Sequence, residues 1–330
     1  MAVYTSIDNP ELYFQAKIYT GDASTQAVTL DGDEDMQPNF VWIKNRATTG
    51  YNTLFDSVRG VEKPLWSNAA SSEGSDSNTL TAFGSDGFTV ASDAAVNGSG
   101  NSLVAYCWKE SADAGFDIVT FTGSGGTQNI SHSLSAKPEL ILNKSRSASG
   151  NWYVYHGANT SAPETDFLQL QATDATSDNA TLWNDTAPTT SVFTVGSAFD
   201  NTTTYVAYAF ASKQGYSKFG KYVGNANTNG TFIYTGFSPA WILHKRSSNT
   251  GDWRVWNNKS EGFNPNPHAL FPNTDATEYN TSNLHIDFLS NGFKFRTSDS
   301  NVNTSGETYI YMAFAEAPFV NSNGVPCNAR

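Results

Sequence analysis

One motif occurs three times in this sequence, at intervals of about one hundred residues. It reads "PNFVWIKNRATTGY" from Pro38, "PELILNKSRSASGNW" from Pro138 and "PAWILHKRSSNTGDW" from Pro239. In each copy a lysine follows the proline by six residues, and a glycine follows the lysine by six more. These landmarks are Lys44, Lys144 and Lys245, with Gly50, Gly150 and Gly251. Such a period favours folds in which one structural unit recurs along the chain.

Other landmarks extend the similarity over the whole period. Each copy opens on a stretch ending in glycine: "YFQAKIYTG", "FDIVTFTG" and "KFGKYVG". A segment centred on phenylalanine follows later, and each copy closes on "SLVAYCWKE", "TYVAYAFAS" or "TYIYMAFAE". The sequence therefore predicts three homologous units at 13–112, 116–217 and 218–320, between an N-terminal segment 1–12 and a C-terminal tail 321–330.

The apolar runs in these units favour β-strands over helices, because they are short and bounded by proline and polar turns. In the second and third copies the turn after the lysine has glycine beside asparagine or aspartate, which is typical of a hairpin turn. We therefore predict an all-β fold of three tandem antiparallel β-sandwich units, of the jelly-roll or lectin-like type. Two sets of aromatic residues are predicted to be buried at equivalent core positions. They are Phe88, Phe193 and Phe293, and Trp108, Phe210 and Phe314.

The links between the units are short, at 111–115 and 212–217. Short links predict that neighbouring units pack on one another instead of flexing. Periodicity alone leaves both a linear rod and a pseudo-threefold arrangement open.

Composition narrows the classes of partner. The net charge is −12 at pH 7, which argues against nucleic acid and anionic membranes. No apolar run is long enough to span a membrane, and the N-terminus lacks the pattern of a secretory signal. Two cysteines, Cys107 and Cys327, are too few for a disulfide framework, so both are expected to be free thiols.

Motifs for catalysis are not found in the sequence. The five histidines form no metal-binding pair with each other or with cysteine. There is no nucleophile elbow, phosphate-binding loop or dinucleotide-binding glycine pattern. The sequence therefore predicts a binding protein without a cofactor. Asp31, Asp33 and Asp35 alternate in "DGDED" and could ligate Ca²⁺, although a solvated acidic loop is the favoured alternative.

Aromatic residues are the other candidates for a site. Those after the repeated turn could stack on sugar rings, but packing in the core is favoured for them; they are Tyr51, Trp152 and Trp253. Three tryptophans repeat less strictly and are the candidates for contact with a glycan or a protein partner: Trp66, Trp183 and Trp256.

Several segments together resemble a family of tailed-phage virion proteins that is frequent in marine phages. They include "SIDNPELYFQAKIYTG", "MQPNFVWIKNR", "LTAFGSDGFTV" and "TYIYMAFAEAPFV". Members of that family are described as tail-fibre or structural proteins with lectin-like (concanavalin-like) sandwich domains. The resemblance implies a location in the virion, assembly in the host bacterial cytoplasm, and other capsid or tail proteins as partners. It supplies no catalytic residues.

The expected function is therefore that of a non-enzymatic virion structural protein on the particle surface, as capsid decoration or attached to the tail. The alternative is a receptor-binding adhesin that recognises host surface glycans. In either role the segment 1–12 could dock to another virion protein, and self-association stays open.

Overall fold

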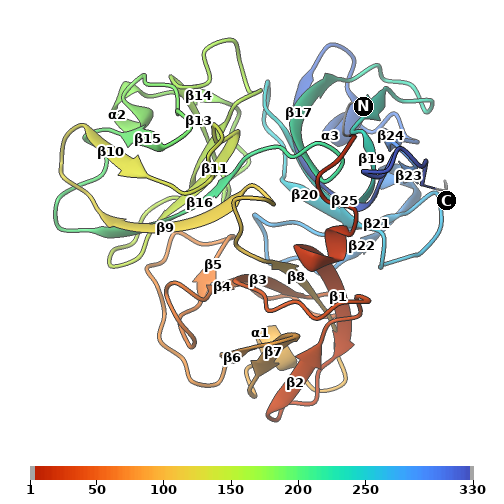
Figure 1. The fold of residues 1–330 in the computed structure, drawn as a ribbon, viewed down its shortest axis with the longest axis horizontal. Helices are drawn as coiled ribbons and strands as arrows, with labels where there is room; N and C mark the ends of the chain where they lie inside the picture. The colour runs from red at the N-terminus through yellow and green to blue at the C-terminus, as the bar shows by residue number, and fades with distance from the viewer. Residues whose placement is uncertain (1–3, 328–330) are drawn as a thin grey trace.

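The protein is built mainly from antiparallel β-sheets, so the prediction of a β fold is confirmed, with a few short helical turns besides the strands. The structure is a computed structural model that describes residues 4–327. Figure 1 shows three lobes around a common centre, coloured red to orange, yellow to green, and teal to blue along the chain. Of the two arrangements that periodicity left open, the pseudo-threefold one is the one observed.

The first lobe contains a larger and a smaller sheet. The larger sheet has the order β1 (Phe14–Thr20), β8 (Ser102–Trp108), β3 (Phe40–Asn45), β4 (Asn52–Asp56) and β5 (Leu65–Trp66). The smaller sheet consists of β2 (Gln26–Thr29), β7 (Gly87–Val90) and β6 (Leu80–Gly84). Two short helices, η1 (Pro10–Leu12) and α1 (Ala94–Asn97), accompany them.

The second lobe has the same plan. Its larger sheet has the order β9 (Phe116–Thr122), β16 (Thr204–Phe210), β11 (Leu140–Ser145), β12 (Tyr153–His156), β13 (Asp166–Gln169) and β14 (Ser177–Asp178). The smaller sheet pairs β10 (Gln128–Ser131) with β15 (Val192–Val195), beside α2 (Ala180–Trp183).

The third lobe repeats this arrangement once more. Its larger sheet has the order β17 (Ser217–Val223), β25 (Thr308–Pro318), β19 (Phe237–Arg246) and β20 (Arg254–Asn257). Its smaller sheet has the order β18 (Phe232–Tyr234), β24 (Gly292–Phe295) and β23 (Ile286–Leu289). The remaining elements are β21 (His268–Ala269), β22 (Tyr279–Asn280), η2 (Ser282–Leu284) and α3 (Ser300–Asn303).

The landmark lysines occupy one position in the three larger sheets. Their strands, β3, β11 and β19, each lie between the last strand of the lobe and the strand that follows the repeated turn. Across the sheet, Lys44 is opposite Val104 and Lys144 is opposite Val206, while Lys245 pairs with Ile310. The lysine strand thus has the same neighbours and an equivalent register in each lobe.

Both faces of each larger sheet are buried. Along β3, Phe40 and Trp42 point into a central core shared by the three lobes, while Val41 and Ile43 face the smaller sheet of their own lobe. Strands that are apolar on successive residues need cover on both sides. The lobes are therefore not three self-contained units in a row, because one face of each larger sheet is covered by the other two lobes.

Equivalent aromatic residues meet at the centre of the shared core. The ring of Trp108 lies 6.5 Å from that of Phe210 and 5.7 Å from that of Phe314, and the two phenylalanine rings are 6.0 Å apart. All three residues are buried, as the sequence predicts. Phe88, Phe193 and Phe293 are likewise buried, each in the core between the two sheets of its own lobe.

The described part of the N-terminal segment packs on its own chain. Ile7 belongs to the central core, and Thr5 lies against Gly215 in the link between the second and third lobes. The Asp8 carboxylate accepts a hydrogen bond from the backbone N–H of Ser322, with 2.7 Å between the heavy atoms. Residues 4–12 therefore form part of the fold.

Candidate functional site

The repeated lysines connect neighbouring lobes. Lys144 Nζ donates to the carbonyl oxygen of Gly150 in its own turn (2.8 Å) and to that of Ala70 in the first lobe (3.3 Å). The Gly150 N–H also donates to the Ala70 oxygen, at 2.7 Å. Each of the other two lysines donates in the same way to a carbonyl oxygen of the lobe that precedes it around the ring. The pairs are Lys44 with Asp275 and Lys245 with Thr173.

These three ammonium groups are buried. Burial lowers the pKa of Lys44, Lys144 and Lys245 to about 8 in each case. Their acceptors are backbone carbonyl oxygens, so each lysine holds a turn against a loop of another lobe. We assign them a structural role.

A second set of polar contacts joins the lobes near the centre. Each lobe contributes one residue at an equivalent position. This residue pairs across the sheet with a core residue of the strand that carries the landmark lysine. The three residues are Asp56, His156 and Asn257. Tyr208 Oη donates to Asp56 at 2.7 Å, His156 lies 3.1 Å from the Tyr311 carbonyl oxygen, and Asn257 Nδ2 donates to Tyr106 Oη at 3.1 Å. Each contact reaches a different lobe, so together they close a ring.

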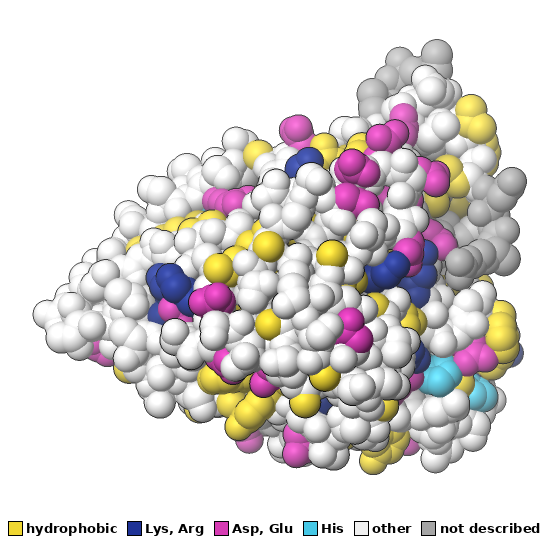
Figure 2. Space-filling model, turned by 90° about the horizontal axis from the view of Figure 1, so that it is seen from below, with side chains coloured by type: hydrophobic (Ala, Val, Ile, Leu, Met, Phe, Trp, Pro, Cys, Tyr) yellow, Lys and Arg dark blue, Asp and Glu magenta, His cyan; other side chains and the backbone are white. Residues whose placement is uncertain are grey.

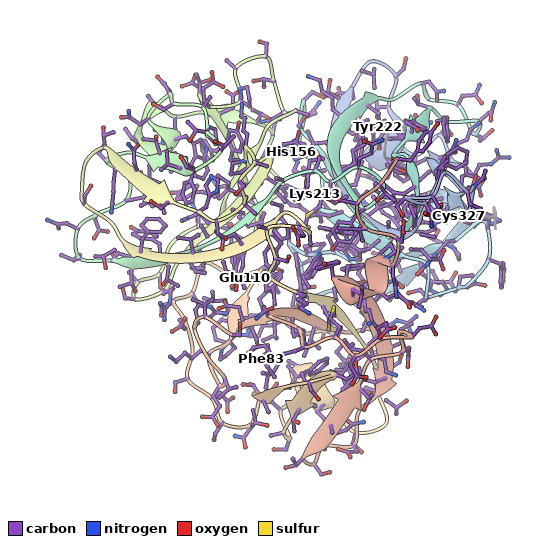
Figure 3. The ribbon with its side chains drawn as sticks, viewed as in Figure 1. Phe83, Glu110, His156, Lys213, Tyr222 and Cys327 are labelled. Atoms are coloured by element: carbon purple, nitrogen blue, oxygen red, sulfur yellow. The ribbon has the colours of Figure 1, made fainter. Side chains whose placement is uncertain are left out.

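The environment of His156 determines its protonation. Burial lowers the pKa of this imidazole to about 4. Its Nδ1 accepts from the Ala158 N–H at 3.2 Å, so Nε2 carries the proton and donates to Tyr311. Figure 3 shows His156 at the side of the second lobe that faces the third. The ring is a neutral link between lobes.

Charged networks also cross the junctions. Buried Arg59 binds Asp56 and donates to Glu73 at 2.9 Å, and Glu73 accepts from Arg146 of the second lobe, also at 2.9 Å. Between the first and third lobes, Arg46 makes a bidentate pair with Glu278, with distances of 2.9 and 2.7 Å. These charged side chains hold the lobes together.

Glu110 lies where the first lobe leads into the second. Burial and the adjacent Asp117 carboxyl raise the pKa of Glu110 to about 7. Its Oε1 accepts from the Ile118 N–H at 3.0 Å, across the link between the lobes. A carboxyl group that titrates near neutrality often marks a functional site, but here it is part of a junction.

The structure separates the three candidate tryptophans. Trp183 and Trp256 are only 2% and 0% exposed, and their indole N–H groups donate to backbone oxygens in the outer cores of their lobes. Burial makes these two unavailable for stacking on a ligand, which corrects the sequence-based assignment. Trp66 is partly exposed, and its ring centroid lies 5.3 Å from that of Tyr51.

The aromatic residues after the repeated turn are not all equivalent. Trp152 and Trp253 are buried and donate from the indole N–H to the preceding lobe, Trp152 to the Trp66 carbonyl oxygen at 2.8 Å. In the first lobe the matching position, opposite the lysine, is Asn52. Tyr51 is one residue away and 50% exposed. The core interpretation thus holds for the two tryptophans and fails for Tyr51.

The acidic candidates do not form a metal site. Asp31, Asp33 and Asp35 are exposed, and Asp31 forms an ion pair with Lys17. Within residues 4–327, no group of three or more His, Cys, Asp or Glu side chains is placed to hold a metal ion. The solvated-loop alternative fits this segment better than Ca²⁺ binding.

A pocket of about 460 Å³ lies where the link between the second and third lobes meets the N-terminal segment. We call it the junction pocket. Its lining includes Tyr4, Glu139, Gln214, Lys218, Tyr234 and Phe319. Tyr4 is 50% exposed and Tyr234 is 53% exposed. Lys218 Nζ donates to the Tyr234 carbonyl oxygen at 2.8 Å and lies 5.3 Å from the centroid of its ring.

Sequence reasoning missed Tyr234, although a signal was available. The second strands of the three lobes read "QAVT", "QNIS" and "FIY". Their buried central residues are Val28, Ile130 and Ile233, opposite Phe88, Phe193 and Phe293. The residues before and after this buried residue point outward. In the third lobe they are Phe232 and Tyr234, whereas the other lobes have small or polar residues there. These are Ala27 and Thr29 in the first lobe, and Asn129 and Ser131 in the second.

Fold and pocket together define a three-lobed, mostly-β protein with a shared core and an aromatic-lined pocket at a lobe junction. The chain belongs to the family described as domain of unknown function DUF7483, whose match spans residues 9–318. That description names no phage protein. No curated protein and no solved structure matches the chain. Among the described residues, no helix is long and apolar enough to cross a membrane.

Proposed function

We propose that this protein is a non-enzymatic structural component of a tailed-phage particle, displayed on the surface as capsid decoration or attached to the tail. The observation that supports this role is the closed ring of contacts around one core. A body held by buried lysines, tyrosine hydrogen bonds and charged networks at its junctions presents its loops on a rigid frame. The resemblance to virion proteins supplies the biological context.

The exterior is compatible with this role. Figure 2 shows a face on which uncharged polar side chains and backbone predominate, with acidic side chains and small hydrophobic groups dispersed among them. A dispersed acidic surface favours solubility in a protein present in many copies.

We further propose that the lobes are three copies of one β-sandwich unit of the jelly-roll, lectin-like type. The shared strand order of the larger sheets supports this, as does the smaller sheet packed on each of them.

The test is to locate the chain in purified particles. Mass spectrometry should detect it at a stoichiometry typical of structural proteins, and cryo-electron microscopy should show density for a three-lobed body on the capsid or tail. Absence from purified particles would reject the role. Incubation with host capsular or lipopolysaccharide glycans should leave their chain length unchanged, whereas depolymerisation would show an enzyme.

A further inference from the structure

We propose that the junction pocket binds an uncharged pyranose ring, as presented by a neutral polysaccharide. This inference goes beyond the structural role and does not depend on where the protein sits in a particle. It rests on a fixed aromatic platform, on polar groups beside that platform, and on a comparison among the three lobes.

The platform is the ring of Tyr234. Its hydroxyl and ring edge lie 3.6–3.9 Å from the position that a Cβ on Gly236 would take, so a side chain at residue 236 would touch the ring and the glycine leaves this edge uncrowded. Gly236 has φ +89°, a conformation that favours glycine. Lys218 holds the residue from another side, by its hydrogen bond to the backbone and its position over the ring. A ring that is held by Lys218 and is still 53% exposed loses little entropy when the apolar face of a sugar stacks on it.

Polar groups stand beside this platform. Glu139 Oε2 accepts from the Ser212 N–H at 3.0 Å, which fixes its carboxylate at the pocket wall, and Gln214 supplies an amide. Carboxylate and amide groups are suited to the donors and acceptors of sugar hydroxyls. The volume of about 460 Å³ is within the range of small-ligand sites. Because Glu139 and Lys218 carry opposite charges, the lining favours a neutral ring over a phosphate or a sugar acid.

The other two lobes act as internal controls. Their second strands have the same register, yet Thr29 and Ser131 stand where the third lobe has Tyr234. The fold therefore does not require an aromatic side chain at this position. A large exposed ring in one lobe of three, beside a pocket, is better explained by contact with a ligand.

Saturation-transfer NMR of the full chain tests the proposal, with D-glucose, D-galactose, D-mannose and N-acetylglucosamine as probes at millimolar concentration. At least one sugar should receive saturation. Tyr234→Ser, which introduces the residue of the second lobe, should weaken its binding at least about tenfold. Phe232→Asn, also a second-lobe residue, is the matched control because Phe232 does not line the pocket, and it should change affinity less than about twofold. Glu139→Gln should weaken binding with the platform intact.

Thermal unfolding of each variant checks that the protein is still folded. Because Tyr234 and Phe232 are exposed, we expect both substitutions to leave the fold intact. The proposal is overturned if none of the four sugars binds, or if Tyr234→Ser binds as well as the wild type. Equal losses in Tyr234→Ser and Phe232→Asn would also overturn it, because the site would then not be the pocket. Binding of single-stranded DNA or of a hydrophobic peptide in place of sugar would have the same consequence.

Discussion

Lys144 in the second lobe donates a hydrogen bond to Ala70 in the first, with 3.3 Å between Nζ and the carbonyl oxygen. The same ammonium group binds Gly150 in its own turn, so one side chain joins two lobes. This arrangement recurs at the other two junctions and makes the lobe boundaries sensitive to single substitutions.

Replacing Lys144 with methionine should lower the free energy of unfolding by about 1–3 kcal/mol, because the buried Gly150 oxygen loses its donor and the Ala70 oxygen keeps only the Gly150 N–H. Chemical denaturation at pH 7 measures the change. Lys137→Met is the control, since Lys137 is exposed and should tolerate the change within about 0.5 kcal/mol. A Lys144→Met protein as stable as the wild type would contradict the assigned role.

The same lysine should make stability depend on alkaline pH. The pKa of Lys144 is about 8 when folded, against an ordinary value of 10.5. Between pH 8 and pH 10.5 the Lys144 amine is protonated in the unfolded chain and mostly neutral in the folded protein. The contribution of Lys144 to the free energy of unfolding therefore rises with pH over this range. The stability difference between wild type and Lys144→Met should therefore widen from pH 8 to pH 9.5. A constant difference over that range would rule out a lowered pKa.

His156 should have an effect in acid. Its pKa is about 4 in the folded protein and ordinarily 6.5. Between these pH values the His156 imidazole is therefore protonated in the unfolded chain and neutral in the folded protein. The free energy of unfolding should fall by about 3 kcal/mol as pH decreases from 6.5 to 4 on account of this residue. His156→Asn, which places there the residue of the third lobe, should flatten the slope. An unchanged slope in the variant would show that other groups are responsible.

Glu110 should act in the opposite direction. Its pKa is raised to about 7 from 4.5, so the unfolded chain releases the proton first and this residue lowers stability as pH rises through that interval. Glu110→Gln should therefore be more stable relative to wild type at pH 8 than at pH 4.5. Thermal midpoints at the two pH values provide the measurement, and the reverse order would be inconsistent with burial of the carboxyl.

Two tyrosines near the centre allow a matched comparison. Tyr208 donates to Asp56, which is ion-paired with Arg59, whereas Tyr106 bonds to the neutral amide of Asn257. Hydrogen bonds to charged groups contribute about 1.5–3 kcal/mol, and neutral ones about 0.5–1.5. Tyr208→Phe should thus destabilise the protein more than Tyr106→Phe in the same denaturation assay. Equal losses would mean that the charge on Asp56 adds nothing.

Local patterns predicted the strands and their burial well. The order of proline, lysine and glycine placed Lys44, Lys144 and Lys245 on strands with the same neighbours, and Phe88 in the core of its lobe. The strand placement and the burial could be predicted because each depends on residues that lie close together in the chain.

Arrangement between lobes was beyond sequence reasoning, because a rod and a ring have the same period. His156 lies 155 residues from its partner Tyr311, and no local pattern indicates that separation. Trp256 is a candidate for a surface site because it repeats less strictly, yet it is buried in the core between the two sheets of its lobe. The junction pocket needs Tyr4 and Phe319 from opposite ends of the chain, so Tyr234 could be noticed only by aligning the repeats.

The central core has a consequence for how such a molecule can arise. A single lobe separated from the ring would expose Phe40, Trp42 and Trp108 to water, a hydrophobic face that soluble monomers rarely carry. Each lobe contacts the preceding lobe with one surface and the next lobe with another. Head-to-tail contacts of this kind are the geometry of a closed cyclic oligomer. A lone lobe of this kind would therefore need two partners of similar shape to cover that face. Carrying the three lobes on one chain makes this assembly intramolecular and independent of protein concentration, so the outward residues of each lobe can differ without loss of the shared core.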